Sequence, residues 1–202
     1  MVLVFLSESR CKVKLLQDRI IRDGKVLPGN IIKVDGFLNH RVDIDLLKAM
    51  ADEFYSVFAD DKPTLILTVE ASGIALATIV AERFHLPLLF AKKAKSDNIE
   101  GGLYKSEIFS YTYKKAVNLI VSAEWLGEND RVLVIDDFLA NGEALRGVID
   151  IAHQANAEVV GVGVAVEKGF QPGGQKLRDA GYKLHSLAII ENADENGITF
   201  RE

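Results

Sequence analysis

Two stretches in the first part of the chain carry apolar residues at helical spacing and predict helices. The first spans Lys12–Asp23, and the second begins at Asp43, a good N-cap residue, and extends to about Ala59. Between them, Val26–Asn30 predicts a turn and Ile31–Val34 an extended segment. The apolar stripes consist of Val13, Leu16 and Ile20 in the first helix, and Leu46, Leu47, Met50, Phe54, Val57 and Phe58 in the second.

From residue 64 onward the pattern changes to short, nearly continuous apolar runs that are separated by helical patterns. Such runs are typical of strands covered on both faces in a parallel sheet. The alternation predicts a doubly wound α/β fold, in which ligands bind beyond the carboxyl ends of the strands. The predicted strands are Thr64–Val69, Leu86–Ala91, Val117–Ser122, Arg131–Ile135 and Val159–Val166, and the predicted helices are Gly73–Phe84, Glu143–Ala155 and Gly174–Ala180.

Composition narrows the class of protein. With 202 residues, 49% of them hydrophobic, the chain is long enough for one domain with a substantial core. The net charge of −5 gives no global basic field, so we expect no nucleic-acid partner. Cys11 is the single cysteine, which excludes an internal disulfide framework and fits a reducing cytoplasm. The apolar start, Met1–Leu6, is too short to span a membrane, so we expect a cytoplasmic protein without a membrane partner.

The segment Arg131–Ala144 carries the strongest chemical signal in the chain. A predicted strand ends in two adjacent carboxylates, Asp136 and Asp137, and a loop of small residues then enters a helix. Small residues and a helix N-terminus present backbone N–H groups to an anion, so the loop is suited to a phosphate. A plain strand–turn–helix connection would account for Asn141 and Gly142, but not for two repelling carboxylates that resist desolvation.

This segment resembles the signature of the type I phosphoribosyltransferases, in which four apolar residues precede two acids, two further apolar residues and a phosphate loop. The resemblance implies that Asp136 and Asp137 are the catalytic carboxylates, which hold the ribose hydroxyls directly or through Mg²⁺. Asn141-Gly142 stands where the family usually has Thr-Gly. The residues implied to hold the 5-phosphate are Ala140, Asn141, Gly142, Glu143 and Ala144.

Two more loops follow predicted strands. Ser72 and Gly73 form a common strand-to-helix turn, but their position is similar to the family's pyrophosphate loop, where backbone amides bind the leaving group. The basic stretch Ala91–Lys115 is either a solvated surface hairpin or a feature that attracts a polyanionic substrate. The resemblance implies a mobile loop that closes over the diphosphate, with Lys92 and Lys93 as contacts. No role follows for its interior, residues 96–105.

The purine side of the site is implied by the resemblance alone. Lys168 ends a buried strand and is either a lysine that extends to solvent or, as in 6-oxopurine enzymes, a donor to the exocyclic oxygen. The segment Asn30–His40 would by itself be an edge strand and a turn. It is similar to the hood of the bacterial xanthine phosphoribosyltransferases, which implies that Ile32 and Asn39 contact the base. We also expect Phe138 to pack on the purine face.

The resemblance extends from about Leu15 to the C-terminus and implies a division of the chain. Residues 1–13 would be an extension, residues 14–42 a hood segment, and residues 43–202 the core, with residues 170–202 contributing to the hood. It also implies a purine salvage enzyme that transfers the phosphoribosyl group of 5-phosphoribosyl diphosphate to N9 of xanthine. The products would be xanthosine 5′-monophosphate and diphosphate. We expect Mg²⁺ as cofactor and a homodimer.

Three alternatives remain open. An adenine phosphoribosyltransferase shares an alanine at position 140, but Lys168 would then face the amino group of adenine, which is also a donor. Hypoxanthine–guanine enzymes carry an aspartate at the place of Ala140, so no general base is evident here. A transcription regulator that senses 5-phosphoribosyl diphosphate would need a basic helix-turn-helix module before Asp43, where the sequence predicts one helix and the hood.

Overall fold

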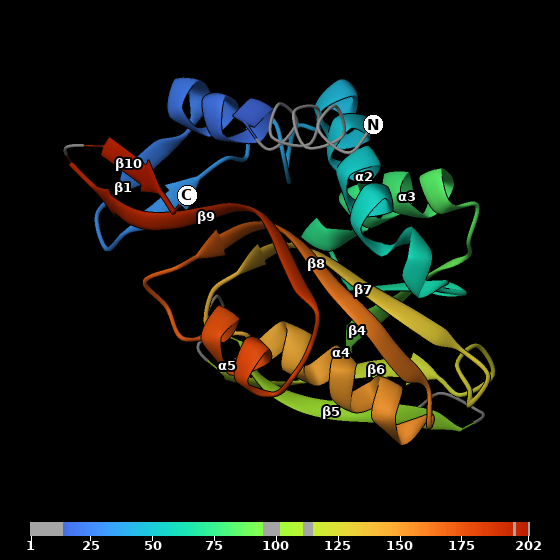
Figure 1. The fold of residues 1–202 in the computed structure, drawn as a ribbon. Helices are drawn as coiled ribbons and strands as arrows, with labels where there is room; N and C mark the ends of the chain where they lie inside the picture. Colours follow the sequence, from blue (N-terminus) through green and yellow to red (C-terminus); the bar gives the residue numbers. More distant parts are fainter. Residues whose placement is uncertain (1–13, 95–101, 111–114, 196, 202) are drawn as a thin grey trace.

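The computed structural model describes residues 14–94, 102–110, 115–195 and 197–201, which form a layered α/β fold (Figure 1). In this described part of the chain, eight strands form one sheet and two form a small separate sheet. The strands are β1 (Lys25–Leu27), β2 (Ile31–Lys33), β3 (Leu65–Val69), β4 (Leu88–Ala94), β5 (Leu103–Ser110), β6 (Lys115–Ser122), β7 (Arg131–Leu139), β8 (Glu158–Lys168), β9 (Leu184–Asp194) and β10 (Gly197–Phe200). The helical segments are residues 14–23, α2 (Ile44–Phe58), the short 3₁₀ turn η1 (Ala59–Asp61), α3 (Ser72–Phe84), α4 (Glu143–Gln154) and α5 (Gly173–Asp179).

The large sheet is parallel at its centre and antiparallel at its edges. Its strand order is β10-β9-β8-β7-β3-β4-β6-β5. Strands β9, β8, β7, β3 and β4 are parallel neighbours, whereas β10, β6 and β5 join through antiparallel pairing. The predicted doubly wound, mostly parallel α/β sheet is confirmed, and the five predicted strands correspond to β3, β4, β6, β7 and β8.

Strands β5, β9 and β10 were not among the predicted strands, and β5 shows why. In β5, Ser106 and Ile108 are buried, whereas Lys105, Glu107 and Phe109 are exposed, so the pattern has period two. A search for continuous apolar runs does not detect a strand with one solvated face. The turn predicted over Val26–Asn30 is also too long, because β1 includes its first two residues.

The two faces of the sheet carry separate apolar cores. Along β3, Ile66 packs with α2 and α3, whereas its neighbours Leu65 and Leu67 pack with α4 on the opposite face. Figure 1 shows α2 and α3 on one side of the sheet and α4 and α5 on the other. Alternation of buried residues to two faces is what a sheet covered by helices on both sides requires. The carboxyl ends of the parallel strands are left open for a site.

Helices α2 and α4 begin where the sequence predicts, and α3 and α5 begin one residue earlier. The carboxylate of Asp43 accepts a hydrogen bond of 3.2 Å from the Leu46 backbone N–H, which confirms Asp43 as the N-cap of α2. Leu16 and Ile20 of the helix over residues 14–23 are fully buried. None of the helices in the described residues is both long and apolar enough to cross a membrane.

The first and the last described segments of the chain pack together on one side of the molecule. Leu16, Ile32 and Phe37 share one apolar cluster with Ile190 and Ala193 of β9. Figure 1 shows β1 and β10 on the same side, next to the helix of residues 14–23. This arrangement supports the proposal that residues 14–42 and the C-terminal strands together form a hood. The cluster also contains α2 and α3 residues, so this hood shares a core with the sheet.

The half-buried His185 predicts a pH dependence of stability. His185 lies on β9, with its ring edge-on to Phe54 and Phe58 of α2. Burial lowers the pKa of His185, and the Glu53 carboxylate, 3.7 Å from Nε2, opposes this only in part. The unfolded chain therefore binds a proton at this histidine at a higher pH than the folded chain does.

We expect the free energy of unfolding to fall as the pH drops below about 6.5, with a slope of at most about 1.4 kcal/mol per pH unit from this group. Asp136, whose pKa is raised by burial, acts in the opposite direction. The difference in Tm between the natural protein and His185→Gln at pH 7.5 and 5.5 isolates the histidine. A difference in Tm that stays constant with pH would contradict this assignment.

Candidate active site

The two predicted catalytic carboxylates lie inside the last part of β7. The strand was predicted to end at Ile135, but it continues to Leu139 because β8 keeps pairing with it, for example Phe138 with Val166. Asp136 and Asp137 are each only 5% exposed. Both are therefore held by regular sheet structure, at the carboxyl ends of the central parallel strands.

Asp137 joins three segments that lie far apart in the sequence. Its Oδ1 accepts a hydrogen bond of 3.0 Å from the Ser72 hydroxyl at the start of α3. Its Oδ2 accepts a hydrogen bond of 2.9 Å from the Asn39 amide, which belongs to the hood segment. The structure thus brings together a predicted ribose ligand, a predicted pyrophosphate-loop residue and a predicted base contact.

Asp136 lies against the tight start of α3. Its Oδ1 accepts a hydrogen bond of 3.0 Å from the backbone N–H of Asp137. A Cβ atom added at Gly73 would lie 2.7 Å from this oxygen and 2.2 Å from Oγ1 of the buried Thr68, so this approach requires a glycine. Burial, followed by the charge of Asp137, raises the pKa of Asp136 well above its ordinary value, and the charge of Lys93 opposes this. A hydroxyl or a cation from a ligand would stabilise this carboxylate.

The loop after β3 also contacts β4. The Glu70 carboxylate accepts a hydrogen bond of 2.6 Å from the Lys93 backbone N–H, and the peptide bond between Glu70 and Ala71 is cis. Lys92 and Lys93 were predicted in a loop, but β4 extends to Ala94 and places both in the strand, with exposed side chains. Of the predicted closing loop, residues 95–101 and 111–114 lie outside the described residues, and residues 103–110 form β5.

The predicted phosphate loop connects β7 to α4. Gly142 is the N-cap of α4, has a φ of 86° and leaves the helix without a side-chain cap. The first backbone N–H groups of α4 therefore need acceptors, and an anion supplies them. The backbone N–H of Gly173 donates to the Ala140 carbonyl at 3.0 Å, which ties the loop to the start of α5. A Cβ atom at Gly173 would lie 2.3 Å from that carbonyl oxygen.

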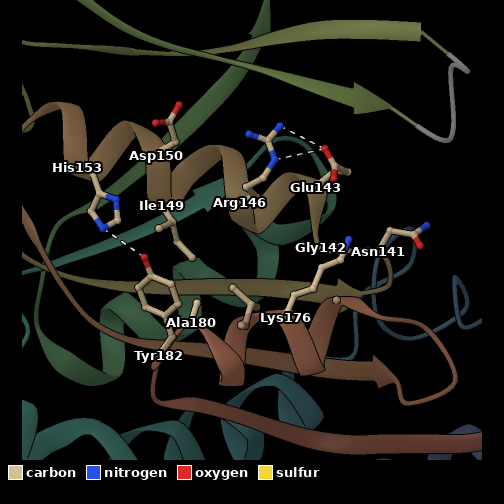
Figure 2. Close-up of a pocket in the computed structure, with 12 residues that line it drawn as sticks. Asn141, Gly142, Glu143, Arg146, Ile149, Asp150, His153, Lys176, Ala180 and Tyr182 are labelled. Atoms are coloured by element: carbon tan, nitrogen blue, oxygen red, sulfur yellow. Dashed lines mark hydrogen bonds and ion pairs between the residues drawn. The ribbon is translucent and has the colours of Figure 1, made fainter.

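A cavity of about 400 Å³ lies beside this loop, between α4 and α5 (Figure 2). Asn141, Gly142 and Glu143 line one end, and Figure 2 shows Lys176 of α5 extending toward Gly142. At the far end, the Tyr182 hydroxyl lies 3.3 Å from His153 Nε2. The two predicted catalytic carboxylates are not among the residues that line this cavity, so it flanks the candidate active site.

The predicted base contacts lie on the hood side of the sheet. Lys168 is the last residue of β8, and its Nζ lies 3.4 Å from the Asn30 carbonyl oxygen in the turn that precedes β2. Burial lowers the pKa of Lys168. Ile32 is buried and Phe138 is half-buried, and both belong to the same apolar cluster. Lys168 thus contacts the turn before β2, and Ile32 and Phe138 share one apolar cluster.

The buried carboxylate of Glu167 binds two residues that lie far from it in the sequence, a link that the sequence did not reveal. Glu167, immediately before Lys168, is 2% exposed. Its two oxygens accept hydrogen bonds of 2.7 Å each from the Arg178 guanidinium of α5, and Ser186 of β9 donates to the same carboxylate. Burial by itself raises the pKa of Glu167, but the hydrogen bonds from Arg178 and Ser186 outweigh it and lower the pKa.

The described residues contain no group of three or more histidine, cysteine, aspartate or glutamate side chains that could hold a metal ion alone. Asp136 and Asp137 nevertheless offer hard carboxylate oxygens at a strand end, which is the donor type that Mg²⁺ prefers. Both side chains are close to the phosphate loop along the same strand and turn. The donor set fits Mg²⁺ when substrate oxygens supply the remaining ligands.

Comparison with known proteins agrees with this geometry. Residues 35–196 match the family described as phosphoribosyl transferase domain. The chain is 51% identical to a xanthine phosphoribosyltransferase of Lachnoclostridium phytofermentans, over 94% of this chain and 98% of the relative. It is 50% identical to a xanthine phosphoribosyltransferase of Bifidobacterium adolescentis, over 94% of this chain and 100% of the relative.

Among solved structures, an adenine phosphoribosyltransferase of Giardia lamblia in complex with 9-deazaadenine superposes with a TM-score of 0.73. The match covers 87% of this chain and 96% of the other, at 23% identity, so it establishes the fold alone. The sequence relatives, the matched family and the acidic pair beside a phosphate loop all agree. This chain therefore belongs to the phosphoribosyltransferase family, among the relatives of the xanthine phosphoribosyltransferases.

Proposed function

We propose that this protein transfers the phosphoribosyl group of 5-phosphoribosyl diphosphate to N9 of xanthine, releasing xanthosine 5′-monophosphate and diphosphate. One observation carries the proposal: Asp137 on β7 is hydrogen-bonded both to Ser72 of the loop after β3 and to Asn39 of the hood. A substrate that fills this junction meets ribose, diphosphate and base contacts together. The names of the sequence relatives support xanthine as the base.

In this proposal the protein contributes positioning and charge. Asp136 and Asp137 accept hydrogen bonds from the ribose hydroxyls, and the amides from Ala140 to Ala144 hold the 5-phosphate. The C1–diphosphate bond breaks as the bond from C1 to the purine N9 forms, through a transition state with oxocarbenium character. Two carboxylates near the ribose stabilise the positive charge that develops on the sugar. Holding the ribose, the diphosphate and the base in place at once accounts for most of the remaining rate enhancement.

We further propose that Mg²⁺ accompanies 5-phosphoribosyl diphosphate. When bound, the ion offsets negative charge on the departing diphosphate. Asp136 and Asp137 are the residues that would hold it, directly or through the ribose hydroxyls. Ser72 and Gly73 remain placed for the diphosphate itself, because they begin α3 and present its first backbone N–H groups.

The lysine at the end of β8 favours an oxopurine over adenine. An ammonium group only donates hydrogen bonds, so Lys168 matches a 6-oxo group and mismatches the 6-amino group of adenine. Ile32 and Phe138 would pack on the two apolar faces that a purine presents. The fold shared with adenine phosphoribosyltransferases carries no information on the base, since the identity is only 23%.

A panel of bases tests the proposal. Purified protein is incubated with 5-phosphoribosyl diphosphate, Mg²⁺ and radiolabelled xanthine, hypoxanthine, guanine or adenine. We expect the highest kcat/KM with xanthine and the lowest with adenine. Highest kcat/KM with adenine would overturn the role of Lys168, and a DNA gel shift without any turnover would favour the regulator.

The hood asparagine and the lysine should affect the bases differently. An amide nitrogen carries two hydrogens, so Asn39 can donate to Asp137 and still donate to the C2 oxygen of xanthine. Asn39→Ala should therefore reduce transition-state stabilisation by about 1–3 kcal/mol more with xanthine than with hypoxanthine. This corresponds to a roughly ten- to hundredfold larger loss of kcat/KM with xanthine. Lys168→Ala should weaken all 6-oxopurines together. Equal losses for every base in Asn39→Ala would show that the asparagine does not recognise C2.

We also propose a cytoplasmic homodimer, on the basis of the family alone. Light scattering at micromolar concentration should give twice the mass of the 22.2 kDa chain. A mass of one chain at that concentration would contradict it.

A further inference from the structure

We propose that the ion pair between the buried Glu167 carboxylate and the Arg178 guanidinium, whose side chain is 33% exposed, is a positioning device that holds Lys168 and the phosphate loop in fixed relative positions. The inference rests on the proposed function, because it concerns how the same site is aligned. Neither residue is expected to touch substrate. Glu167 acts through Lys168, its neighbour in the chain, and Arg178 acts through α5.

The pair is one of three sets of contacts that fix the turn between β8 and α5. At one end of the turn, Lys168 pairs with Ile190 of β9. At the other end, the Gly173 N–H donates to the Ala140 carbonyl in the phosphate loop, at 3.0 Å. The Glu167–Arg178 hydrogen bonds, 2.7 Å each, bridge from the strand before the turn to the helix after it.

The packing around the Glu167 carboxylate fixes the position of this group. A Cβ atom at Gly174 would lie 1.9 Å from Glu167 Oε1, so the helix can approach the carboxylate only because residue 174 has no side chain. Glu167 is also held by Ser186 of β9. A charged group that is 2% exposed is costly to bury, even when it is paired.

Stability alone gives no reason to keep such a pair. Replacing a buried ion pair with apolar residues of similar volume is often neutral or stabilising. Here the carboxylate is buried and the guanidinium is one-third exposed, so solvent also weakens the attraction between the two charges. A planar guanidinium with two parallel hydrogen bonds fixes both distance and orientation between its two elements. Helix α5 has seven residues and few other anchors of this kind in the described structure, so the pair sets its position relative to β8.

Three variants separate positioning from stability. Arg178→Lys keeps the positive charge but loses the two parallel hydrogen bonds of the guanidinium. Glu167→Gln with Arg178→Met removes both charges, so no unpaired charge stays buried. Arg83→Met, which breaks the exposed pair of Arg83 with Asp52, is the matched control. Circular dichroism selects a temperature at which all variants are fully folded, and kcat and KM are measured there for both substrates.

We expect Arg178→Lys and the double variant to raise KM for xanthine and for 5-phosphoribosyl diphosphate at least fivefold, with kcat changing less. Arg83→Met should leave both KM values within twofold of the natural protein. KM values within twofold in Arg178→Lys and in the double variant would overturn the inference, since a purely structural pair does not alter kinetics of folded enzyme. Absence of turnover in the natural protein would instead overturn the proposed function, and this inference with it.

Discussion

Replacing both Asp136 and Asp137 with asparagine should lower kcat/KM by about 10³-fold or more, because each removed charge is aimed at the place where positive charge develops. The same double variant should keep its fold, with a Tm within about 5 °C of the natural protein. Steady-state kinetics and a thermal melt measure the two quantities on one preparation.

The expected stability follows from the surroundings of the two carboxylates. Asp136 is buried, and burial raises its pKa, so an uncharged amide of the same size removes a desolvation cost. An asparagine at position 137 keeps an oxygen acceptor, and the Ser72 hydroxyl can accept from the new amide. A matched control replaces Asp60 and Asp61, two neighbouring acids of η1, with asparagine. These acids lie in another element, so their replacement should leave kcat/KM unchanged. An unchanged kcat/KM in the Asp136→Asn, Asp137→Asn variant would exclude the assigned ribose contacts.

Gly142→Val should raise the KM for 5-phosphoribosyl diphosphate at least tenfold. Gly142 has a φ of 86°, which a β-branched residue does not adopt readily. In the proposed function its backbone is also part of the loop that the 5-phosphate approaches closely. A Cβ atom there would also lie 3.2 Å from the Gly173 Cα, so the loop would be displaced from α5. Loss of two or more hydrogen bonds to a charged phosphate, at about 1.5–3 kcal/mol each, readily accounts for this change.

Gly181→Val separates backbone strain from ligand binding. Gly181 has a φ of 85°, and a Cβ atom at this position would meet no other atom within 4 Å. The substitution therefore carries the same conformational cost without contacting the phosphate loop. Both variants should lose stability, but only Gly142→Val should change the KM. A rise in KM of equal size in the two variants would show that the loop at Gly142 has a structural role and does not bind the phosphate.

Local signals predicted most of the core fold. Buried parallel strands such as β3 and β7 are continuous apolar runs, and the Asp43 cap and the glycine at the start of α4 mark helix ends. Strand β5 was missed because it has one solvated face, and β7 was predicted too short because two buried carboxylates interrupt its apolar run. The extension of β7 depends on pairing with β8, which no local pattern contains.

The candidate site shows the same division. Asp136, Asp137 and the phosphate loop are contiguous in sequence, so their composition was sufficient to identify them. The Asn39–Asp137 hydrogen bond joins residues that only the fold brings together. The Glu167–Arg178 pair was missed because a glutamate and an arginine on either side of a turn are ordinary surface residues until burial is known. The Pro-Gly-Gly sequence at the start of α5 (residues 172–174) was the available signal, since tight packing there requires glycine.

The most direct test of the central claim is to identify the products of one reaction. The purified protein is incubated with xanthine, 5-phosphoribosyl diphosphate and Mg²⁺, and nucleotide and diphosphate are quantified by mass spectrometry and a coupled assay. We predict xanthosine 5′-monophosphate and diphosphate in equal amounts, with both formed at least about 10³-fold more slowly by the Asp136→Asn, Asp137→Asn variant. Diphosphate without nucleotide, or no product from any purine, would contradict phosphoribosyl transfer at this site.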